Sequence, residues 1–270
     1  MKSIVKDKRI LGYESLSSFP NISHFVTTRV GGCSIGNYTS FNCSPYCGDD
    51  SESVRRNQVL LCSELSITPD QLVIPYQIHS TNSLLIDHAY LSASPDVRLK
   101  KLYGKDALLT DCPGLCLCIS TADCVPILLY DKKHQAIAVV HAGWRGTVDC
   151  ILSKVFEEMD QAFGTQGDDV VACIGPSISL DSFEIGIEVY DIFKKGGFDM
   201  GRIARWHDES RKFHIDLWEA NREQLIDCGI SPSQIELAGI CTFKSHDIFF
   251  SARRLGVKSG RILSGIMLRK

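Results

Sequence analysis

The stretch DCVPILLYDKKHQAIAVVH (123–141) contains two apolar runs on either side of the polar segment 131–134. Apolar runs that flank a short polar turn predict a β-hairpin. If the turn is centred between Lys132 and Lys133, Cys124 lies opposite His141. Directly opposed side chains share a face, with Cβ atoms about 4.5–5.5 Å apart. That distance suits two ligands of one metal ion or a thiol beside its base, whereas a slip of one residue would put them on opposite faces.

The residues that follow the hairpin, AGWRGT (142–147), lead into a predicted amphipathic helix over 148–163. Apolar residues recur there at the spacing of one helix face. The two glycines allow the backbone to approach a ligand closely, and the helix N-terminus and Arg145 offer donors to an anion. The segment is therefore compatible with a phosphate or carboxylate site. It is equally compatible with a tight strand-to-helix turn that carries a surface arginine.

The rest of the chain mixes strands and helices without a repeat, linker or low-complexity tract, which predicts a single domain over 1–270. The hairpin implies antiparallel pairing, so we expect an α+β fold with mixed sheets rather than a doubly wound parallel sheet. The further elements expected from periodicity and stop signals are helices at 51–65, 184–195 and 216–228, strands at 72–78, 115–119, 126–130, 136–140 and 170–174, and a last buried strand at 235–241.

Composition excludes several classes of protein. The net charge is −3, with no clustered basic face of the kind that nucleic-acid binding needs. The basic residues from Arg253 to Lys270 are interpreted as a solvated C-terminal surface. No apolar run is long enough for a signal peptide or a membrane span, so we expect a cytoplasmic protein. Its twelve cysteines are then interpreted as reduced thiols, most of them buried.

Two further segments carry weaker signals. His79 follows a predicted strand in QIHS (77–80), and spacing alone does not bring it to the hairpin. The loop TTRVGGCSIG (27–36) is rich in glycine and carries Arg29, but it lacks the Gly-Lys-Ser/Thr ending of a phosphate-binding P-loop.

Together these segments resemble the YfiH family, also called the laccase-domain or polyphenol-oxidoreductase family. The resemblance extends over most of the chain, and its most specific motifs are TADCVP and HAGWRGT, in this order and spacing. The matching stretches are TTRVGGCSIGNYTSFN (27–42), QIHS (77–80), DALLTD (106–111), STADCVPILLYD (120–131), HAGWRGT (141–147), IGPSIS (174–179), FEIG (183–186), CTF (241–243), FFSARR (249–254) and SGR (259–261).

The resemblance implies a layered α/β sandwich, similar to the catalytic domain of cytotoxic necrotizing factors. It also implies a catalytic zinc ion held by His79, Cys124 and His141. Three protein ligands and one open position are typical of a catalytic zinc site. Cu²⁺ could replace zinc, because copper binds such ligands more tightly.

Family members act on purine nucleosides. The resemblance implies phosphorolysis of adenosine, inosine, guanosine and methylthioadenosine, and deamination of adenosine, by a chain that we expect to be a monomer. Arg29 and Arg145 are then the expected phosphate clamps. Gln77 and Asp106 are candidate pocket residues. Asp123 is a candidate for orienting a ligand or for acid/base catalysis, and equally for a turn residue.

The sequence departs from the family pattern at two of these motifs. Ala252 stands where the family usually has tyrosine before the arginine pair, and Phe183 stands where YEVG is common. Neither position is an implied metal ligand. The loss of a phenol close to the pocket is expected to affect the choice of substrate.

Three rival functions remain open at this point. A copper polyphenol oxidase is disfavoured because the chain has eight histidines and no His-x-His pair. A metal-free hydrolase would use Cys124 as nucleophile and His141 as base, on an amide such as one in a peptidoglycan precursor. A non-enzymatic binding module would show no turnover of nucleosides.

Overall fold

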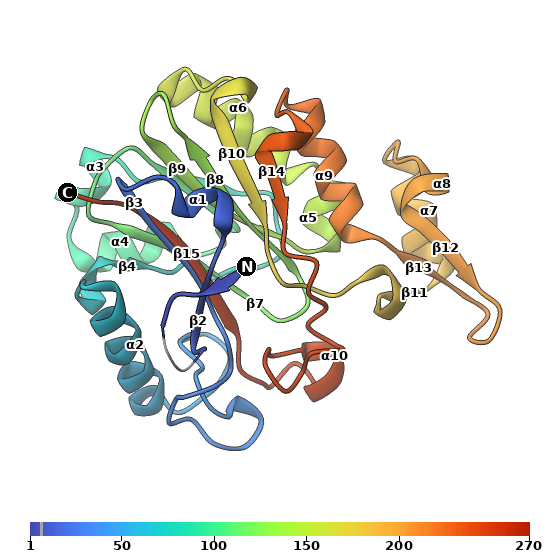
Figure 1. Ribbon diagram of the computed structural model, residues 1–270, viewed down its shortest axis with the longest axis horizontal. Coiled ribbons are helices and arrows are strands. Elements are labelled where there is room, and N and C mark those ends of the chain that lie inside the picture. Colours follow the sequence, from blue (N-terminus) through green and yellow to red (C-terminus); the bar gives the residue numbers. More distant parts are fainter. Residues whose placement is uncertain (6–7) are drawn as a thin grey trace.

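Two six-stranded sheets lie face to face in the computed structural model, which describes residues 1–5 and 8–270 (Figure 1). The first sheet has the order β1 (Lys2–Ser3), β2 (Ile10–Gly12), β3 (Ile22–Thr27), β15 (Ile262–Leu268), β7 (Cys116–Thr121), β4 (Leu72–Val73). The second has the order β14 (Ile235–Leu237), β10 (Val170–Ile174), β8 (Val125–Asp131), β9 (Ala136–Ala142), β6 (Ala107–Thr110), β5 (Ser83–Leu85). Neighbours are antiparallel except in the pairs β4–β7, β5–β6 and β10–β14. The predicted α+β class with mixed sheets is confirmed.

Helices cover the outer faces of both sheets and complete a layered sandwich. Alternate residues of β8 and β9 pack against α5 (Trp144–Val148), α6 (Ile151–Phe163) and α9 (Leu217–Asp227) on one side of the second sheet. Their other face packs against the first sheet. Beyond the first sheet, Leu61 of α2 (Ser51–Leu65) joins a third apolar cluster. The central strands are therefore buried on both faces, which explains their nearly continuous apolar runs.

A small three-stranded sheet projects from this body (Figure 1). It has the order β11 (Glu184–Ile185), β13 (Lys212–Ile215), β12 (Ala204–His207), with α7 (Ile187–Lys195) and α8 (Met200–Ile203) beside it. Phe193, Ile203 and Ile215 belong to the same apolar cluster as the second sheet. The remaining helices are α1 (Glu14–Ser17), α3 (His88–Ser92), α4 (Pro95–Leu102) and α10 (Ala252–Leu255). No helix within the described residues is long and apolar enough to cross a bilayer.

The predicted register of the hairpin was wrong by two residues, although the predicted face was right. His141 pairs with Pro126, and the strands are joined by the loop 132–135. The carboxylate of Asp131 sets this loop, because it accepts the backbone N–H groups of Lys133 and His134, both at 2.9 Å. Since a shift of two residues keeps the alternation of side chains, Cys124 and His141 remain on the face toward the first sheet.

Two predicted helices differ from those observed. The helix expected over 148–163 begins earlier, at Trp144, and is interrupted at Cys150, whose φ of +56° ends α5 before α6 begins. The helix expected over 184–195 begins only at Ile187, because its first two residues form β11. The helix over 51–65 is confirmed. Asp216 caps α9 as predicted, accepting two backbone N–H groups.

Strand predictions were least successful near the chain's C-terminal end. The strand expected to be last and buried at 235–241 is only β14, a partly exposed edge strand. The final strand is β15, which is fully buried between β3 and β7 and lies within the stretch interpreted as solvated surface. The basic side chains around it, such as Arg253 and Arg269, are exposed. The strand expected at 72–78 is confined to β4, since the chain leaves the sheet before Pro75.

Candidate metal centre

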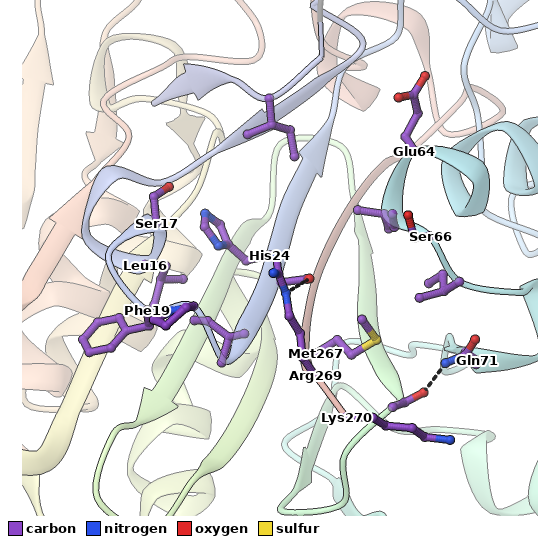
Figure 2. A pocket seen from close by; sticks show the side chains of 17 residues that line it. Leu16, Ser17, Phe19, His24, Glu64, Ser66, Gln71, Met267, Arg269 and Lys270 are labelled. Carbon is purple, nitrogen blue, oxygen red and sulfur yellow. Dashed lines mark hydrogen bonds between the residues drawn. The ribbon is translucent and has the colours of Figure 1, made fainter.

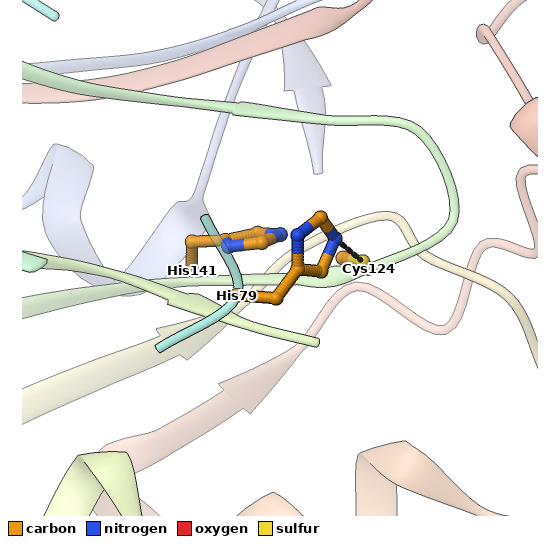
Figure 3. A group of neighbouring side chains, drawn as sticks. All are labelled: His79, Cys124 and His141. Atoms are coloured by element: carbon orange, nitrogen blue, oxygen red, sulfur yellow. Dashed lines mark hydrogen bonds between the residues drawn. The ribbon is translucent and has the colours of Figure 1, made fainter. Parts of the chain in front are cut away.

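His79, Cys124 and His141 meet at one end of the sheets, although they are distant in the sequence (Figure 3). His141 lies in β9, Cys124 immediately precedes β8, and His79 lies in the loop between β4 and β5. The Cys124 Sγ and His79 Nε2 atoms are 3.8 Å apart, and the imidazole ring centroids 4.8 Å. One ligand atom from each residue lies within 4.8 Å of the others. The structure thus brings together all three expected ligands.

This donor set fits a zinc ion. Bond lengths of about 2.3 Å to sulfur and about 2.0–2.1 Å to nitrogen place S and N roughly 3.5 Å apart in a tetrahedron, close to the 3.8 Å found here. Within the described part of the chain, the group has three donors and no fourth His, Cys or carboxylate. His79 is exposed, Cys124 half-buried and His141 buried. Three ligands at a solvent-accessible position leave a coordination site for water or substrate.

The carboxylate of Asp106 ties two of the ligands into place from beneath. It is fully buried, and its Oδ1 accepts from His141 Nδ1 at 2.8 Å and from the backbone N–H of His79 at 3.0 Å. Its Oδ2 accepts from the backbone N–H groups of Ile78 and Ser80 and from the Ser80 hydroxyl. A carboxylate on Nδ1 leaves Nε2 of His141 free for a metal and fixes the ring's orientation.

Electrostatics favour the metal-binding thiolate form of Cys124 but the protonated form of His141. Burial alone would raise the pKa of Cys124, but His141 and His79 outweigh it and lower that pKa below its usual value. Burial would lower the pKa of His141, but Cys124 and Asp106 raise it. In Asp106, burial is outweighed by hydrogen bonds from His141 and Ser80, which lower its pKa. The thiolate is therefore available near neutral pH, and a metal ion must displace a proton from His141.

The backbone beside the ligands has unusual conformations. His79 has a φ of +63° and Asp123 a φ of +83°, a region that non-glycine residues rarely adopt. Three N–H groups on Asp106 hold the His79 turn, while Asp123 is held by Thr242 Oγ1 and the Arg253 N–H, each 2.7 Å from a carboxylate oxygen. Such residues persist only where the surroundings over-determine them, and they concentrate at functional sites.

Gly143 allows the backbone to pass directly under the metal ligands. A Cβ atom there would lie 3.0 Å from His79 Cδ2 and 3.2 Å from Cys124 Sγ. Its φ of −68° is open to any residue, so Gly143→Ala is expected to act on the ligands and not on the backbone. Displacing a side chain from its rotamer costs about 1 kcal/mol, so we expect zinc affinity to fall about fivefold. Competition with a chromophoric chelator measures this, and unchanged affinity would contradict it.

A cavity of about 220 Å³ opens over the three ligands. Two buried hydroxyl oxygens at its wall, Ser120 Oγ and Thr121 Oγ1, have no hydrogen-bond partner within the described residues. A polar wall of this kind suits a polar ligand. The residues that line the cavity are Ser44, Tyr46, Cys47, Pro75, Gln77, His79, Ser120, Thr121, Ala122, Cys124, His141, Ala252, Val257 and Arg261.

Neither arginine that was expected to clamp phosphate lines this cavity. Arg29 donates to the backbone carbonyls of Thr39 at 2.8 Å and His246 at 2.6 Å, and lies over the Phe250 ring. Arg145 is exposed and lies over the ring of its neighbour Trp144. The cavity has instead Arg261, which sequence reasoning missed. The signal available for it was the SGR motif (259–261).

The other predicted pocket residues mostly have structural partners. Gln77 lines the cavity, but its amide is paired with the backbone of Ser120 through two hydrogen bonds of 3.0 and 2.8 Å. Asp106 lies beneath the ligands and does not line the cavity. Both oxygens of Asp123 are occupied, as described above, which favours its interpretation as a turn residue over a catalytic one. Of the two departures from the family pattern, Ala252 lines the cavity and Phe183 belongs to the core.

A larger cavity lies elsewhere. About 730 Å³ of space separates the C-terminal ends of α2 and β15 from the α1–β3 segment, with Leu16, His24 and Arg269 among its lining residues (Figure 2). It holds none of the expected ligands. Size alone therefore does not identify the functional site in this fold.

Fold and site together define a layered α+β protein with a His/Cys/His group that could hold a metal ion at the edge of its sandwich. The family model described as multi-copper polyphenol oxidoreductase laccase matches residues 23–269. The chain belongs to this family, whose solved members include proteins named YfiH. The structure is similar to the crystal structure of Bacillus licheniformis hypothetical protein YfiH, with a TM-score of 0.88 over 97% of each chain. The two sequences are 28% identical.

Curated relatives match along nearly the whole chain. A protein of Bacteroides thetaiotaomicron named purine nucleoside phosphorylase is 66% identical over 270 residues, all of both chains. Adenosine deaminase RL5, from an unknown prokaryotic organism, is 40% identical over 92% of this chain and 95% of its own. The family that the sequence motifs indicated is thereby confirmed.

Proposed function

We propose that this protein is a zinc-dependent purine nucleoside enzyme that phosphorolyses adenosine, inosine, guanosine and methylthioadenosine and deaminates adenosine. The observation that carries the proposal is the convergence of His79, Cys124 and His141 at an open cavity. It is supported by the 66% identity, over the full length, to a protein named purine nucleoside phosphorylase. The 40% identity to a protein named adenosine deaminase supports the second activity.

The two reactions ask different things of the site. In phosphorolysis a phosphate oxygen bonds to C1′ of the ribose while the glycosidic bond breaks. The electron pair of the glycosidic bond leaves with the base, which takes up a proton. In deamination water adds to C6 and ammonia leaves. His79, Cys124 and His141 would hold zinc, which when bound supplies Lewis-acid polarisation of an oxygen atom. Asp106 keeps His141 oriented, and the cavity admits the nucleoside beside these ligands.

The proposal is tested by incubating the zinc-loaded protein with inosine and phosphate and separating the products chromatographically. Hypoxanthine and ribose 1-phosphate are expected in equal amounts, and adenosine without phosphate is expected to give inosine and ammonia. Removal of the metal with a chelator should abolish both activities, and zinc should restore them. Protein that retains zinc and yields neither product would contradict the proposal.

The metal-dependence experiment also separates the rival functions. A cysteine hydrolase would keep its activity in the chelator and lose it to a thiol alkylator. A copper polyphenol oxidase would contain copper after purification without added copper and would oxidise phenols. The chemistry of the ligands allows Cu²⁺ to compete with zinc, so the metal content must be measured before any reconstitution.

We propose Arg261 as the phosphate contact, because it is the arginine at the cavity wall, where its guanidinium is held by the backbone carbonyls of residues 257, 259 and 260. Arg261→Gln is expected to raise the KM for phosphate by about tenfold or more, since a charge-assisted hydrogen bond contributes about 1.5–3 kcal/mol. Deamination needs no phosphate and should change much less. Arg145→Ala, at the exposed arginine outside the cavity wall, is the comparison. A larger rise of the phosphate KM in Arg145→Ala would count against the assignment. So would an equal loss of phosphorolysis and deamination activity in Arg261→Gln.

A further inference from the structure

Three tyrosine rings continue the wall of the metal cavity out to the protein surface. Tyr46 lines the cavity itself, beside the loop that carries His79. Tyr46, Tyr76 and Tyr103 have exposed fractions of 39%, 40% and 65%. Rings of this size bury large apolar areas when they find a partner. Three neighbouring tyrosines left partly exposed, one of them in the cavity wall, therefore indicate a surface that a ligand covers.

The rings are held in fixed positions by the backbone and by one another. Tyr76 and Tyr103 are stacked, with ring centroids 4.9 Å apart and planes 14° apart. The Tyr76 N–H donates to the Leu102 carbonyl at 3.0 Å, and the Gly104 N–H donates to the Tyr76 carbonyl at 2.8 Å. Tyr46 meets Tyr76 edge to face at 5.2 Å and 68°. The orientation of Tyr46 is thus set before any ligand arrives.

The size of the cavity argues that a bound nucleoside extends toward these rings. Ligand pockets usually enclose about 300–1,000 Å³, whereas this cavity has about 220 Å³. A nucleoside that reaches the metal ligands would therefore fill this small cavity as far as Tyr46 in its wall. Tyr46 is the one Phe, Tyr or Trp among the described residues of the cavity wall. It is therefore the ring available to a flat heteroaromatic group.

We propose that Tyr46 stacks on the purine base of the substrate, an inference that rests on the proposed function. Tyr76 acts as a positioning residue that holds the Tyr46 ring by its edge contact, and Tyr103 supports Tyr76 from outside. Stacking uses the π-face that every purine has, so it is tolerant of the 6-substituent. The same surface would accept adenosine, inosine and guanosine.

The decisive measurement is binding of the free base to the zinc-loaded protein. Adenine affinity is measured by calorimetry for the wild type, Tyr46→Ala and Tyr46→Phe, with zinc content checked in each. Base–aromatic stacking predicts a loss of about 10- to 100-fold for Tyr46→Ala and an affinity within about twofold of the wild type for Tyr46→Phe, which keeps the ring. Trp206→Ala, at an exposed ring of the projecting sheet, is the matched control and should bind adenine normally.

Kinetics provide the second readout. Tyr46→Ala should raise the KM for nucleosides more than it lowers kcat, and inhibition by ribose 1-phosphate should be unaffected. Three results would overturn the stacking role. They are unchanged adenine affinity in Tyr46→Ala, a loss of adenine affinity that follows the loss of zinc, and an equal loss of adenine affinity in Tyr46→Phe. Failure of the wild type to turn over any nucleoside would instead overturn the proposed function, while adenine binding would still report on Tyr46.

Discussion

Replacement of Cys124 by alanine is expected to remove most of the affinity for zinc and, with it, the activity. Zinc sites with four ligands bind with about 10–16 kcal/mol, or roughly 3 kcal/mol per ligand, so the loss of one ligand should weaken binding more than 100-fold. His79 and His141 would remain as a two-nitrogen site. The measurements are zinc content after dialysis, the dissociation constant from chelator competition, and nucleoside turnover.

A second cysteine provides the control for this substitution. Hydrogen bonds with Ser179 and Ser182 outweigh the effect of burial and lower the pKa of Cys241, which is a buried thiol. It is not part of the ligand group. Cys241→Ala should therefore lose some stability but keep its zinc. Retention of tightly bound zinc by Cys124→Ala would show that the sulfur is not a ligand.

Cys124→Asp separates a ligand from a nucleophile at the same position. A carboxylate is an accepted zinc ligand with a bond of about 2.0–2.2 Å, so this variant should keep part of its zinc and part of its turnover. A cysteine hydrolase could not survive the change, because the attacking atom would be gone. Activity in Cys124→Asp that responds to zinc would therefore exclude the thiolate mechanism.

Asp106→Asn is expected to have the second large effect. The amide has one acceptor oxygen in place of two. An oxygen in the Oδ1 position can still accept from His141 and the His79 N–H, but the NH2 group then faces the N–H groups of Ile78 and Ser80. In the opposite orientation the NH2 group faces His141. Loss of a carboxylate that orients a metal-bound histidine typically costs 10–100-fold in affinity or activity. Breaking a buried charged network costs about 3–5 kcal/mol. Zinc competition and denaturant unfolding measure the two effects.

The pH dependence of stability provides an independent check on Asp106. Its pKa is lowered in the folded state, so its stabilising effect is fully present above the unfolded value of about 3.9 and is lost as pH falls through the folded pKa. In Asp106→Asn there is no carboxylate to protonate at this position, so the loss of stability that protonation of Asp106 causes in the wild type should be absent. The wild type should therefore lose more stability than the variant as pH falls below about 4.

Asp131→Asn is the matched control for Asp106→Asn. Asp131 is also fully buried and also accepts two backbone N–H groups and a histidine Nδ1, that of His134 at 2.8 Å. It sets the turn of the hairpin, at the far end of β8 from the metal ligands. The control should lose comparable stability and keep its zinc affinity. Equal losses of zinc affinity in both variants would reduce the role of Asp106 to general stability.

The hairpin shows how far local sequence can determine a site. The two apolar runs identified the strands of 123–141, and their period of two put Cys124 and His141 on one face. The register was decided by the Asp131 carboxylate, whose hydrogen bonds set the length of the loop. The pattern of apolar residues carries no information about this effect. The prediction that Cys124 and His141 share a face was still right, because side chains in a strand alternate with a period of two and the register was wrong by two residues.

His79 and Asp106 show what local sequence cannot determine. No spacing connects the 77–80 loop with the hairpin, and only the family resemblance named His79 as a ligand. The buried carboxylate of Asp106, which joins His79 to His141, was expected in the pocket and lies beneath it. The residues next to it in the sequence do not indicate which side of the ligands a single carboxylate will occupy. β15 was missed for a related reason: its apolar run is short and flanked by basic residues, and its central place depends on β3 and β7.

The sequence by itself therefore determined the strands and helices with strong periodicity, the mixed α+β class and, through its motifs, the family and the three expected metal ligands. Tertiary structure alone decided that these residues converge and that Asp106 holds His79 and His141 in place. It also decided that Arg261 lines the cavity and that Arg29 and Arg145 do not, and that Tyr46 lies in the cavity wall. The reason is physical. Periodicity reports which face of an element is buried, whereas a site is made where loops from different sheets meet, and that depends on how the sheets pack.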